Sequence, residues 1–278
     1  MPIIQADFYR RPLKDSTGQP LWELLLCDES GNFRFNAFCP QSQATVDWVK
    51  ERFLEAFKSV QPETIKVFRP QSLSSIIKSA AEKLNIPVEG SRKTQILKEW
   101  LKERWSSSYL SERSTGEIYE PLEIEKLPPI PLPEGLWGEV WRFAAIEAGE
   151  IVERFRDFPI PVVEMPENLW PLNLGIASTI QVPGVVINGG KKAMRLTRAL
   201  AEKTPVALSY IPGNPDGLIL EAGLNERWII ATFEDQEVAA AGKVYEQRKL
   251  LSKGLHFLLI QPDDSGMTYS GFWLLREE

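Results

Sequence analysis

The order of predicted strands and helices in the first 105 residues most constrains the fold. Apolar or alternating stretches separated by Gly, Asp and Asn turns are typical of strands, and apolar residues at helical spacing are typical of helices. Three consecutive strands followed by alternating helices and strands predict a mixed sheet flanked by helices. The predicted elements are strands at 8–13, 21–27 and 33–38, a helix after Thr45, a strand at 65–68, a helix from Leu73, a strand at 86–88 and a helix after Thr94.

Right-handed crossovers leave few topologies for this order, and the ribonuclease H-like arrangement is one of them. Such an arrangement suggests a carboxylate site for two metal ions. Asp7 stands just before the first strand, where such a fold often places an acid, but Arg69 and Pro70 follow the fourth strand in place of a carboxylate. The catalytic set is therefore incomplete. A metal-dependent nuclease that uses Asp7 and helix carboxylates stays open as an alternative.

The length of 278 residues predicts two domains, each large enough for its own core. We predict an N-terminal mixed α/β domain at 1–108, an acidic Pro-rich linker at 109–135 and a C-terminal α/β domain at 136–278. The run Leu127–Pro133, which contains four prolines, predicts a stiff connector. Between Leu110 and Trp170 there are thirteen acids and five bases, so the formal charge of −6 arises there.

The second domain is predicted to alternate strands with two helices after a loop-rich, proline-containing portion. One stretch, 206–260, repeats the strand, strand, strand, helix, strand order of 8–69, which suggests that the second half is a permuted relative of the first. The predicted elements are strands at 140–145 and 184–187, a helix after Lys192, strands at 206–211, 218–222 and 228–233, a helix at about 236–252, and strands at 255–260 and 271–275.

Several functional classes are excluded by what the sequence lacks. No apolar run approaches the roughly 18 residues of a membrane span, and the N-terminus resembles neither a signal peptide nor an import leader, so we expect a cytoplasmic protein. Cys27, Cys39 and the single histidine, His256, are too few for a zinc site; we expect buried free thiols and a histidine with a local partner. Because no nucleotide-binding or nucleophile motif is present, we expect no catalysis, no metal and no cofactor.

A basic island interrupts the acidic chain. Between Ile65 and Trp105 there are nine lysines and arginines against four glutamates. Cations at a helix N-terminus are unfavourable for the helix and favourable for a bound anion such as phosphate. Aromatic candidates for base stacking are Tyr9, Trp48, Trp100, Trp105 and Trp273, although helical spacing favours the core for the middle three. The predicted strand-to-helix corners carry Arg69, then Arg92 and Lys93, then Lys191 and Lys192.

Long motifs give the chain a family resemblance. The motifs are DFYRRPL, LWELLLCD, FCP, FRPQ, IPVEGSRKT, ERWIIATFED, GLHFLLIQPD and GFWLL, which extend from Asp7 to Leu275. They resemble the Tab/Atab family of RNA-binding proteins from cyanobacteria and chloroplasts. The resemblance implies RNA binding in the translation or biogenesis of photosystem reaction-centre proteins, photosystem I above all, and a cyanobacterial member. It also implies an RNA-binding role for Trp273-Leu274-Leu275.

These observations predict a two-domain, non-catalytic RNA-binding protein. Its partners would be a photosystem messenger leader and, in addition, translation or assembly factors. The candidate RNA-binding residues are Arg69, Arg92, Lys93, Lys191, Lys192, Trp273, Leu274 and Leu275. Besides the nuclease, a second alternative stays open, in which the acidic segment and the Pro-rich linker serve a protein-interaction or assembly factor.

Overall fold

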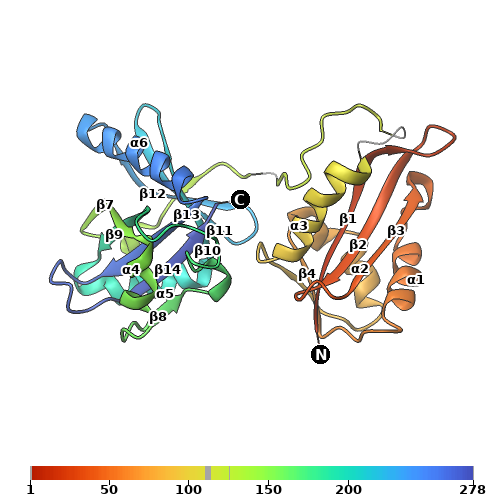
Figure 1. Ribbon diagram of the computed structural model, residues 1–278, viewed down its shortest axis with the longest axis horizontal. Coiled ribbons are helices and arrows are strands. Elements are labelled where there is room, and N and C mark those ends of the chain that lie inside the picture. Colours follow the sequence, from red (N-terminus) through yellow and green to blue (C-terminus); the bar gives the residue numbers. More distant parts are fainter. Residues whose placement is uncertain (1, 110–113, 125, 278) are drawn as a thin grey trace. The chain divides into compact units, whose positions relative to one another are not determined.

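The computed structural model of the chain describes residues 2–109, 114–124 and 126–277. It divides into two compact units, unit 1 at Met1–Glu125 and unit 2 at Lys126–Glu278 (Figure 1). This division falls inside the predicted linker 109–135, of which residues 110–113 and 125 lie outside the described part. In the described part of that segment, Ser114 bridges to Leu13 in unit 1 and residues 130–131 join a sheet of unit 2.

Unit 1 is built on one five-stranded sheet with the order β3-β2-β1-β4-β5. The first three strands are antiparallel neighbours, whereas β4 and β5 run parallel to β1. This is the ribonuclease H-like arrangement that the element order allows. The elements are β1 (Ile3–Lys14), β2 (Pro20–Asp28), β3 (Arg34–Pro40), α1 (Val46–Ala56), β4 (Thr64–Val67), α2 (Ile76–Glu82), β5 (Val88–Gly90) and α3 (Gln95–Arg104).

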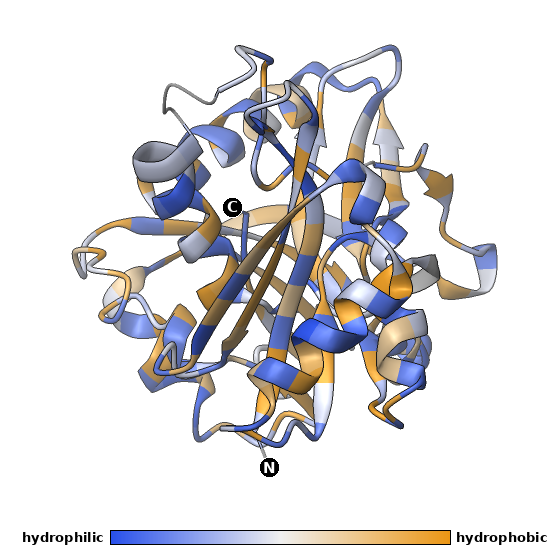
Figure 2. Cartoon of the chain, turned by 90° about the vertical axis from the view of Figure 1, so that its right-hand side faces the viewer, coloured by the Kyte–Doolittle hydropathy of each residue, from blue (hydrophilic) through white to orange (hydrophobic). Residues whose placement is uncertain are grey.

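Both faces of the unit 1 sheet are covered. Leu24 and Leu26 of β2 belong to a core shared with α1 and α2, whereas Leu25 and Cys27 pack with Leu97 of α3. The alternation follows from the period of two in a strand, and it explains why β2 is apolar almost throughout. Figure 2, which is turned by 90° from Figure 1, shows helices that carry both hydrophilic and hydrophobic residues, as amphipathic helices do.

The helix predicted from Leu73 begins later in the structure. Pro70–Ser74 forms a 3-10 turn, and α2 starts only after Ser75, whose hydroxyl accepts a hydrogen bond from the Ile77 N–H. Thr45 caps α1 as the sequence predicts, with its hydroxyl 3.3 Å from the Trp48 nitrogen. The first residue of α2 is thus set by a serine cap, which satisfies one of the free N–H groups of the first turn.

Unit 2 contains two mixed sheets, with the orders β10-β11-β12-β6 and β7-β9-β13-β14-β8. Helix α4 was not predicted, because it lies in a stretch that reads as a proline-containing loop. The elements are β6 (Ile130–Pro131), β7 (Val140–Glu147), α4 (Ala148–Phe155), β8 (Val162–Glu164), β9 (Gln181–Asn188), α5 (Ala193–Lys203), β10 (Pro205–Ile211), β11 (Asp216–Ala222), β12 (Glu226–Phe233), α6 (Gln236–Leu251), β13 (Leu255–Gln261) and β14 (Gly271–Arg276).

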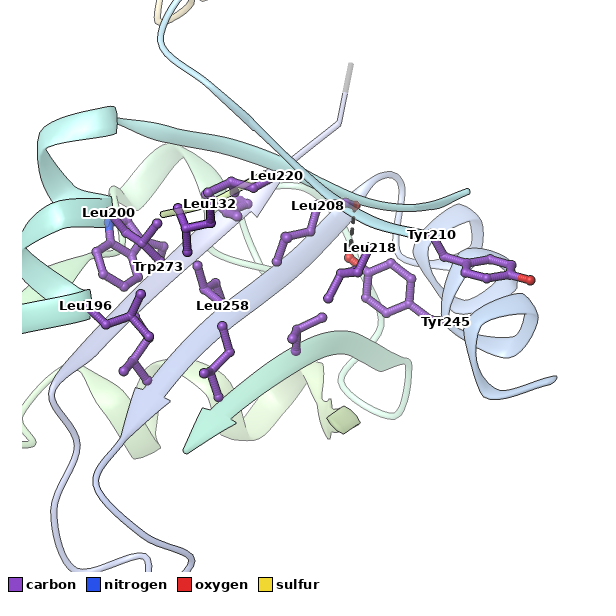
Figure 3. Packing of buried hydrophobic residues seen from close by; sticks show 14 of the residues in the cluster. Leu132, Leu196, Leu200, Leu208, Tyr210, Leu218, Leu220, Tyr245, Leu258 and Trp273 are labelled. Carbon is purple, nitrogen blue, oxygen red and sulfur yellow. Dashed lines mark hydrogen bonds between the residues drawn. The ribbon is translucent and has the colours of Figure 1, made fainter. Parts of the chain in front are cut away.

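The two sheets and helix α5 share one core. Leu208 and Leu220 from one sheet pack with Leu258 and Trp273 from the other, and Leu200 of α5 completes this part (Figure 3). The hydroxyl of Tyr245 on α6 donates to the Leu208 carbonyl at 3.0 Å, drawn as a dashed line in Figure 3. Helix α5 is therefore fixed to the C-terminal strand by apolar packing.

The suggestion that the second half is a permuted relative of the first is wrong. In unit 1, β4 lies beside β1, the first strand of the antiparallel set. In unit 2, the corresponding strand β13 pairs with β9 and β14, whereas β10 lies in the other sheet. Similar element order therefore does not give the same strand order.

The cysteines and the histidine behave as the sequence predicts. Cys27 and Cys39 are buried free thiols, and burial raises their pKa to about 12 and about 11. The ring of His256 is buried between two backbone partners, accepting from the Leu208 N–H and lying 2.8 Å from the Gly254 carbonyl. None of the helices in the described residues is long and apolar enough to cross a membrane.

Candidate nucleic-acid interface

A buried ion network occupies the centre of unit 1, on the α3 side of the sheet. The carboxylate of Asp7 is fully buried and accepts from Arg69 Nε at 3.0 Å and from Arg11 Nη2 at 2.9 Å. Arg11 is itself buried, and its Nε lies 3.2 Å from Glu23 Oε2. Burial alone would raise the pKa of Asp7, but the charges and hydrogen bonds of Arg69 and Arg11 outweigh it and hold that pKa below 3.8.

Segment 114–124 covers this network. Arg11 Nη1 donates to the Tyr119 hydroxyl at 2.8 Å, and Arg69 donates to the carbonyls of Pro121 and Glu123 at 2.6 and 2.7 Å. Burial raises the pKa of Tyr119, so its phenol stays protonated near neutral pH. The segment thus supplies neutral polar groups to guanidinium donors that would otherwise be buried unpaired.

Arg69 is therefore a structural residue. Its side chain is buried, and the guanidinium lies over the ring of Tyr9 at 4.2 Å and that of Phe68 at 4.7 Å. With Asp7 and two carbonyls as further partners, no side of the group reaches a ligand at the surface. The sequence placed Arg69 at an exposed corner because its partners lie 62, 52 and 54 residues away in the chain.

The second corner, at the start of α3, is capped from inside the unit. The Leu97 N–H donates to the side-chain oxygen of Gln5 on β1 at 2.9 Å. The buried Lys98 extends its Nζ to the Arg92 carbonyl at 2.7 Å. Lys93 is exposed and Arg92 is partly buried. This helix end therefore has an uncharged acceptor in place, and Lys93 is the cation of this pair that faces solvent.

Trp273, Leu274 and Leu275 lie in the core, each with at most 3% of its surface exposed. Trp273 and Leu275 belong to the cluster that includes Leu196 and Leu200 of α5, whereas Leu274 faces the opposite cluster. Figure 3 shows the indole beside the two leucines of α5. These side chains are enclosed by protein, and two of them support the helix that carries the third predicted corner.

That third corner has a different character. Lys191 and Lys192 are exposed in the turn that enters α5, and Arg195 and Arg198 continue along the outer side of the helix. The buried side of α5 carries Leu196 and Leu200, opposite the arginines at helical spacing. We call Lys191, Lys192, Arg195 and Arg198 the α5 basic face.

The α5 basic face lacks acidic partners. Within the described part of the chain, no carboxylate lies within ion-pair distance of any of its four cations. Two other surface cations of unit 2 do have acidic partners: Arg142 lies 2.7 Å from Asp264, and Lys203 lies 3.6 Å from Glu226. Four cations without an ion-pair partner, two on α5 and two in the turn that enters it, form a local positive potential, which favours a polyanionic ligand.

The glycines before α5 bring one acid close to this face. Gly190 has a left-handed φ of +52°, and a side chain there would collide with the carboxylate of Glu139. The Glu139 N–H donates to the Asn188 carbonyl at 2.8 Å, which fixes the backbone of this residue. The carboxylate therefore lies at the positive end of the helix, where an anion is favoured.

Two arginines of this face were missed from the sequence. The corner analysis stopped at the first turn of the helix, whereas Arg195 and Arg198 follow Lys191 at the i+4 and i+7 positions that share one helix face. That spacing, set against buried Leu196 and Leu200, was the available signal. This spacing indicates a basic face only if that side of the helix is exposed to solvent, and the structure shows that it is.

Comparisons with known proteins give matches over nearly the whole chain. Residues 3–104 match the family described as RNA-binding protein Tab2/Atab2 N terminal, and residues 119–276 match RNA-binding protein Tab2/Atab2, C-terminal domain. A chloroplastic Protein TAB2 homolog of Arabidopsis thaliana is 28% identical over 98% of this chain and 73% of its own length. The homolog of Zea mays is 28% identical over 98% of this chain and 71% of its own.

Among solved structures, the HTLV-2 integrase catalytic core domain in complex with magnesium matches 40% of this chain and 76% of its own at 18% identity, with a TM-score of 0.25. The two family matches lie in the same order as the two compact units. With both of its parts matched, the chain belongs to the Tab2/Atab2 family of RNA-binding proteins.

Proposed function

We propose that this protein binds single-stranded RNA through the α5 basic face, without cleaving it. The observation that carries the proposal is the set of four exposed cations on α5 and the turn that enters it, which have no acidic partner among the described residues. Cations at the start of a helix cost it roughly 0.3–1 kcal/mol each, so helix stability does not explain Lys191 and Lys192. A phosphate chain supplies the missing negative charge.

In this proposal, Trp273 and Leu275 do not touch RNA but hold helix α5 in place. They pack against Leu196 and Leu200, and thereby hold α5 with its cations outward. The role that the family resemblance implies for the C-terminal residues is then indirect. Lys93, exposed in unit 1, is a further phosphate contact in the proposal, whereas Arg69 and the partly buried Arg92 maintain the fold of unit 1.

The absence of catalysis is part of the proposal, and the state of Asp7 supports it. Asp7 stands on the central strand of a ribonuclease H-like sheet, but both of its oxygens accept from guanidinium groups and segment 114–124 covers it. A metal ion there would have to displace two buried cations, at a large electrostatic cost. Incubation of labelled RNA with Mg²⁺ or Mn²⁺ separates the alternatives, because cleavage that is lost in an Asp7→Asn variant that is still folded would establish a nuclease.

The proposed biological setting is supported by the relatives and by the family resemblance. Both are named chloroplastic TAB2 homologs, and we propose that this chain, like the family that it resembles, supports translation or biogenesis of photosystem reaction-centre proteins in the cytoplasm. The RNA ligand would then be a photosystem messenger leader. Crosslinking RNA in cells and sequencing the recovered fragments tests this directly.

The binding face is tested by salt titration. For single strands, log K falls with log[salt] at a slope of about −0.7 per neutralised phosphate, so four contacts predict a contribution of about −3. Replacing all four cations with glutamine should weaken RNA binding and flatten the slope by that amount. The matched control removes four exposed lysines elsewhere and should change the slope little: Lys14→Gln, Lys58→Gln, Lys102→Gln and Lys243→Gln.

Equal effects of the two quadruple variants would mean that binding is a property of net charge and not of the α5 basic face. If RNA is not retained at all and a protein partner associates independently of salt, the interaction-factor alternative is correct. That outcome would direct attention to the acidic stretch between Leu110 and Trp170, where thirteen acids outnumber five bases.

A further inference from the structure

Trp137 is the most exposed of the nine tryptophans, all of which lie in described residues, with 53% of its surface accessible. Its ring is nevertheless held in place, because its Nε1–H donates to the Leu132 carbonyl at 2.6 Å. Leu132 is buried in the core with Leu196 and Leu200 of α5. An exposed indole with a fixed orientation loses little side-chain freedom when a flat ligand covers it.

The position of Trp137 connects it to the α5 basic face. A methyl group on Gly135 would lie 3.5 Å from Arg195 Nη2, and the Glu139 carboxylate lies against Gly190. Segment 135–139 therefore runs beside the first turns of α5, with Trp137 as its middle residue. Two residues span at most about 7 Å, so the Trp137 backbone is within that reach of the backbones of Gly135 and Glu139.

From these observations we infer that Trp137 is a stacking platform for one base of a single-stranded RNA whose phosphates lie on the α5 basic face. The inference rests on the function proposed above and adds the base contact that the four cations alone do not supply. Every base presents a flat π-face, so this contact tolerates different base identities. Charge complementarity makes RNA, and not an apolar protein segment, the occupant of this surface.

Two substitutions separate the aromatic face from the shape of the residue. Trp137→Leu keeps apolar bulk and removes the ring, whereas Trp137→Phe keeps a smaller ring. Stacked bases contribute enough that Trp137→Leu should lose roughly 5- to 150-fold in affinity for a fluorescently labelled uridine oligomer. Trp137→Phe should lose less. Exposed Leu172 offers the control, and Leu172→Ala should bind as the unmodified protein does.

A base-free polyanion distinguishes stacking from charge. Inorganic polyphosphate should bind Trp137→Leu and the unmodified protein equally, because it meets only the cations. RNA should also quench the intrinsic fluorescence of the unmodified protein more than that of Trp137→Phe. Equal losses for RNA and polyphosphate would show that the residue merely shapes α5, and the inference would be overturned.

The inference and the proposed function fail in different ways. If Trp137→Leu binds RNA normally while the quadruple glutamine variant of the α5 basic face does not, RNA binding stands and the stacking platform is wrong. If neither set of variants changes RNA binding, the interface itself lies elsewhere. If Trp137→Leu releases a protein partner and leaves RNA affinity unchanged, the ring is a protein contact and the inference fails.

Discussion

Asp7 and Arg69 form a buried ion pair in which the guanidinium Nε lies 3.0 Å from the carboxylate Oδ1. The pair joins the central strand β1 to the second residue after β4, 62 positions later in the chain. Because Arg69 also donates to two carbonyls of segment 114–124, this one residue connects the sheet to its covering segment. The position that an enzyme of this topology could use for a metal ligand thus serves stability here.

Asp7→Asn should destabilise unit 1 by about 3–5 kcal/mol, because removing one partner leaves buried charge uncompensated. Arg11 would then keep Glu23 as its ion-pair partner, and Arg69 would keep the carbonyls of Pro121 and Glu123. The free energy of unfolding in urea measures the effect. Glu117→Gln is the matched control: Glu117 pairs with Arg10 at 2.7 Å at the surface, and its loss should cost at most about 1 kcal/mol. Equal losses in the two variants would mean that the buried network is not the stabilising element.

Trp273→Ala should lower both stability and RNA affinity, because the cavity that it leaves lies beneath α5. Large-to-small substitutions of buried aromatic residues cost about 3–5 kcal/mol. Trp273→Phe, which fills more of the space beside Leu196 and Leu200, should retain most of both properties. Thermal melting and RNA titration of the same samples measure the two effects. An alanine variant with unchanged melting and no RNA binding would show that the indole touches RNA directly, against the positioning role.

Local signals sufficed for much of the fold. The strands of unit 1 and the mixed sheet followed from alternation and turn residues, since these patterns depend on neighbours in sequence. Helix α4 was missed although Ala148, Ile151 and Phe155 stand at helical spacing, because the prolines that follow from Pro159 made the stretch resemble a loop. The position of β13 was misjudged for another reason, because strand partners are chosen by packing between sheets, which element order does not encode.

The candidate site was harder to predict. From the sequence, Arg69 was interpreted as an exposed cation at a strand-to-helix corner. Only the fold reveals Asp7 and segment 114–124 as its partners. Trp137, in contrast, gave no periodic signal: it stands between Gly135 and Gly138, where neither helix nor strand spacing applies. An aromatic residue in such a glycine-flanked turn has no neighbours on a regular element to bury it. That feature could have drawn attention to Trp137.

Stability should fall between pH 6.5 and 4.5, and His256 should cause it. Burial, the largest effect, lowers the pKa of His256 from 6.5 to about 3 in the folded chain. The unfolded chain therefore takes up a proton first as the pH falls, and stability is full above pH 6.5 and declines below it by up to about 1.4 kcal/mol per pH unit. Urea unfolding at several pH values measures the slope.

The assignment to His256 is clear because it is the only histidine. Asp7 has the same sign in a lower range: its folded pKa is also lowered, from 3.8, so its contribution is lost only as the pH falls below about 4. In His256→Asn the protein should be less stable at pH 7, since Leu208 and Gly254 lose their ring partner, and the decline from pH 6.5 to 4.5 should disappear. A decline that persists in this variant would point to buried carboxylates instead.

Glu139→Gln should strengthen RNA binding. The carboxylate lies against Gly190 at the entrance to α5, where the helix dipole favours an anion, so it occupies a place that a phosphate would take and repels phosphates held by Lys191 and Lys192. Removing one such charge should raise affinity by about 2- to 5-fold, the equivalent of roughly 0.4–1 kcal/mol. Glu153→Gln, an equal charge change at an exposed position on α4, controls for net charge.

Because the side chain of Glu139 is exposed, the substitution should leave melting unchanged, and a gain in affinity would place a phosphate at this turn. Unchanged or weaker binding in Glu139→Gln would instead place the RNA away from the start of α5, toward Arg198.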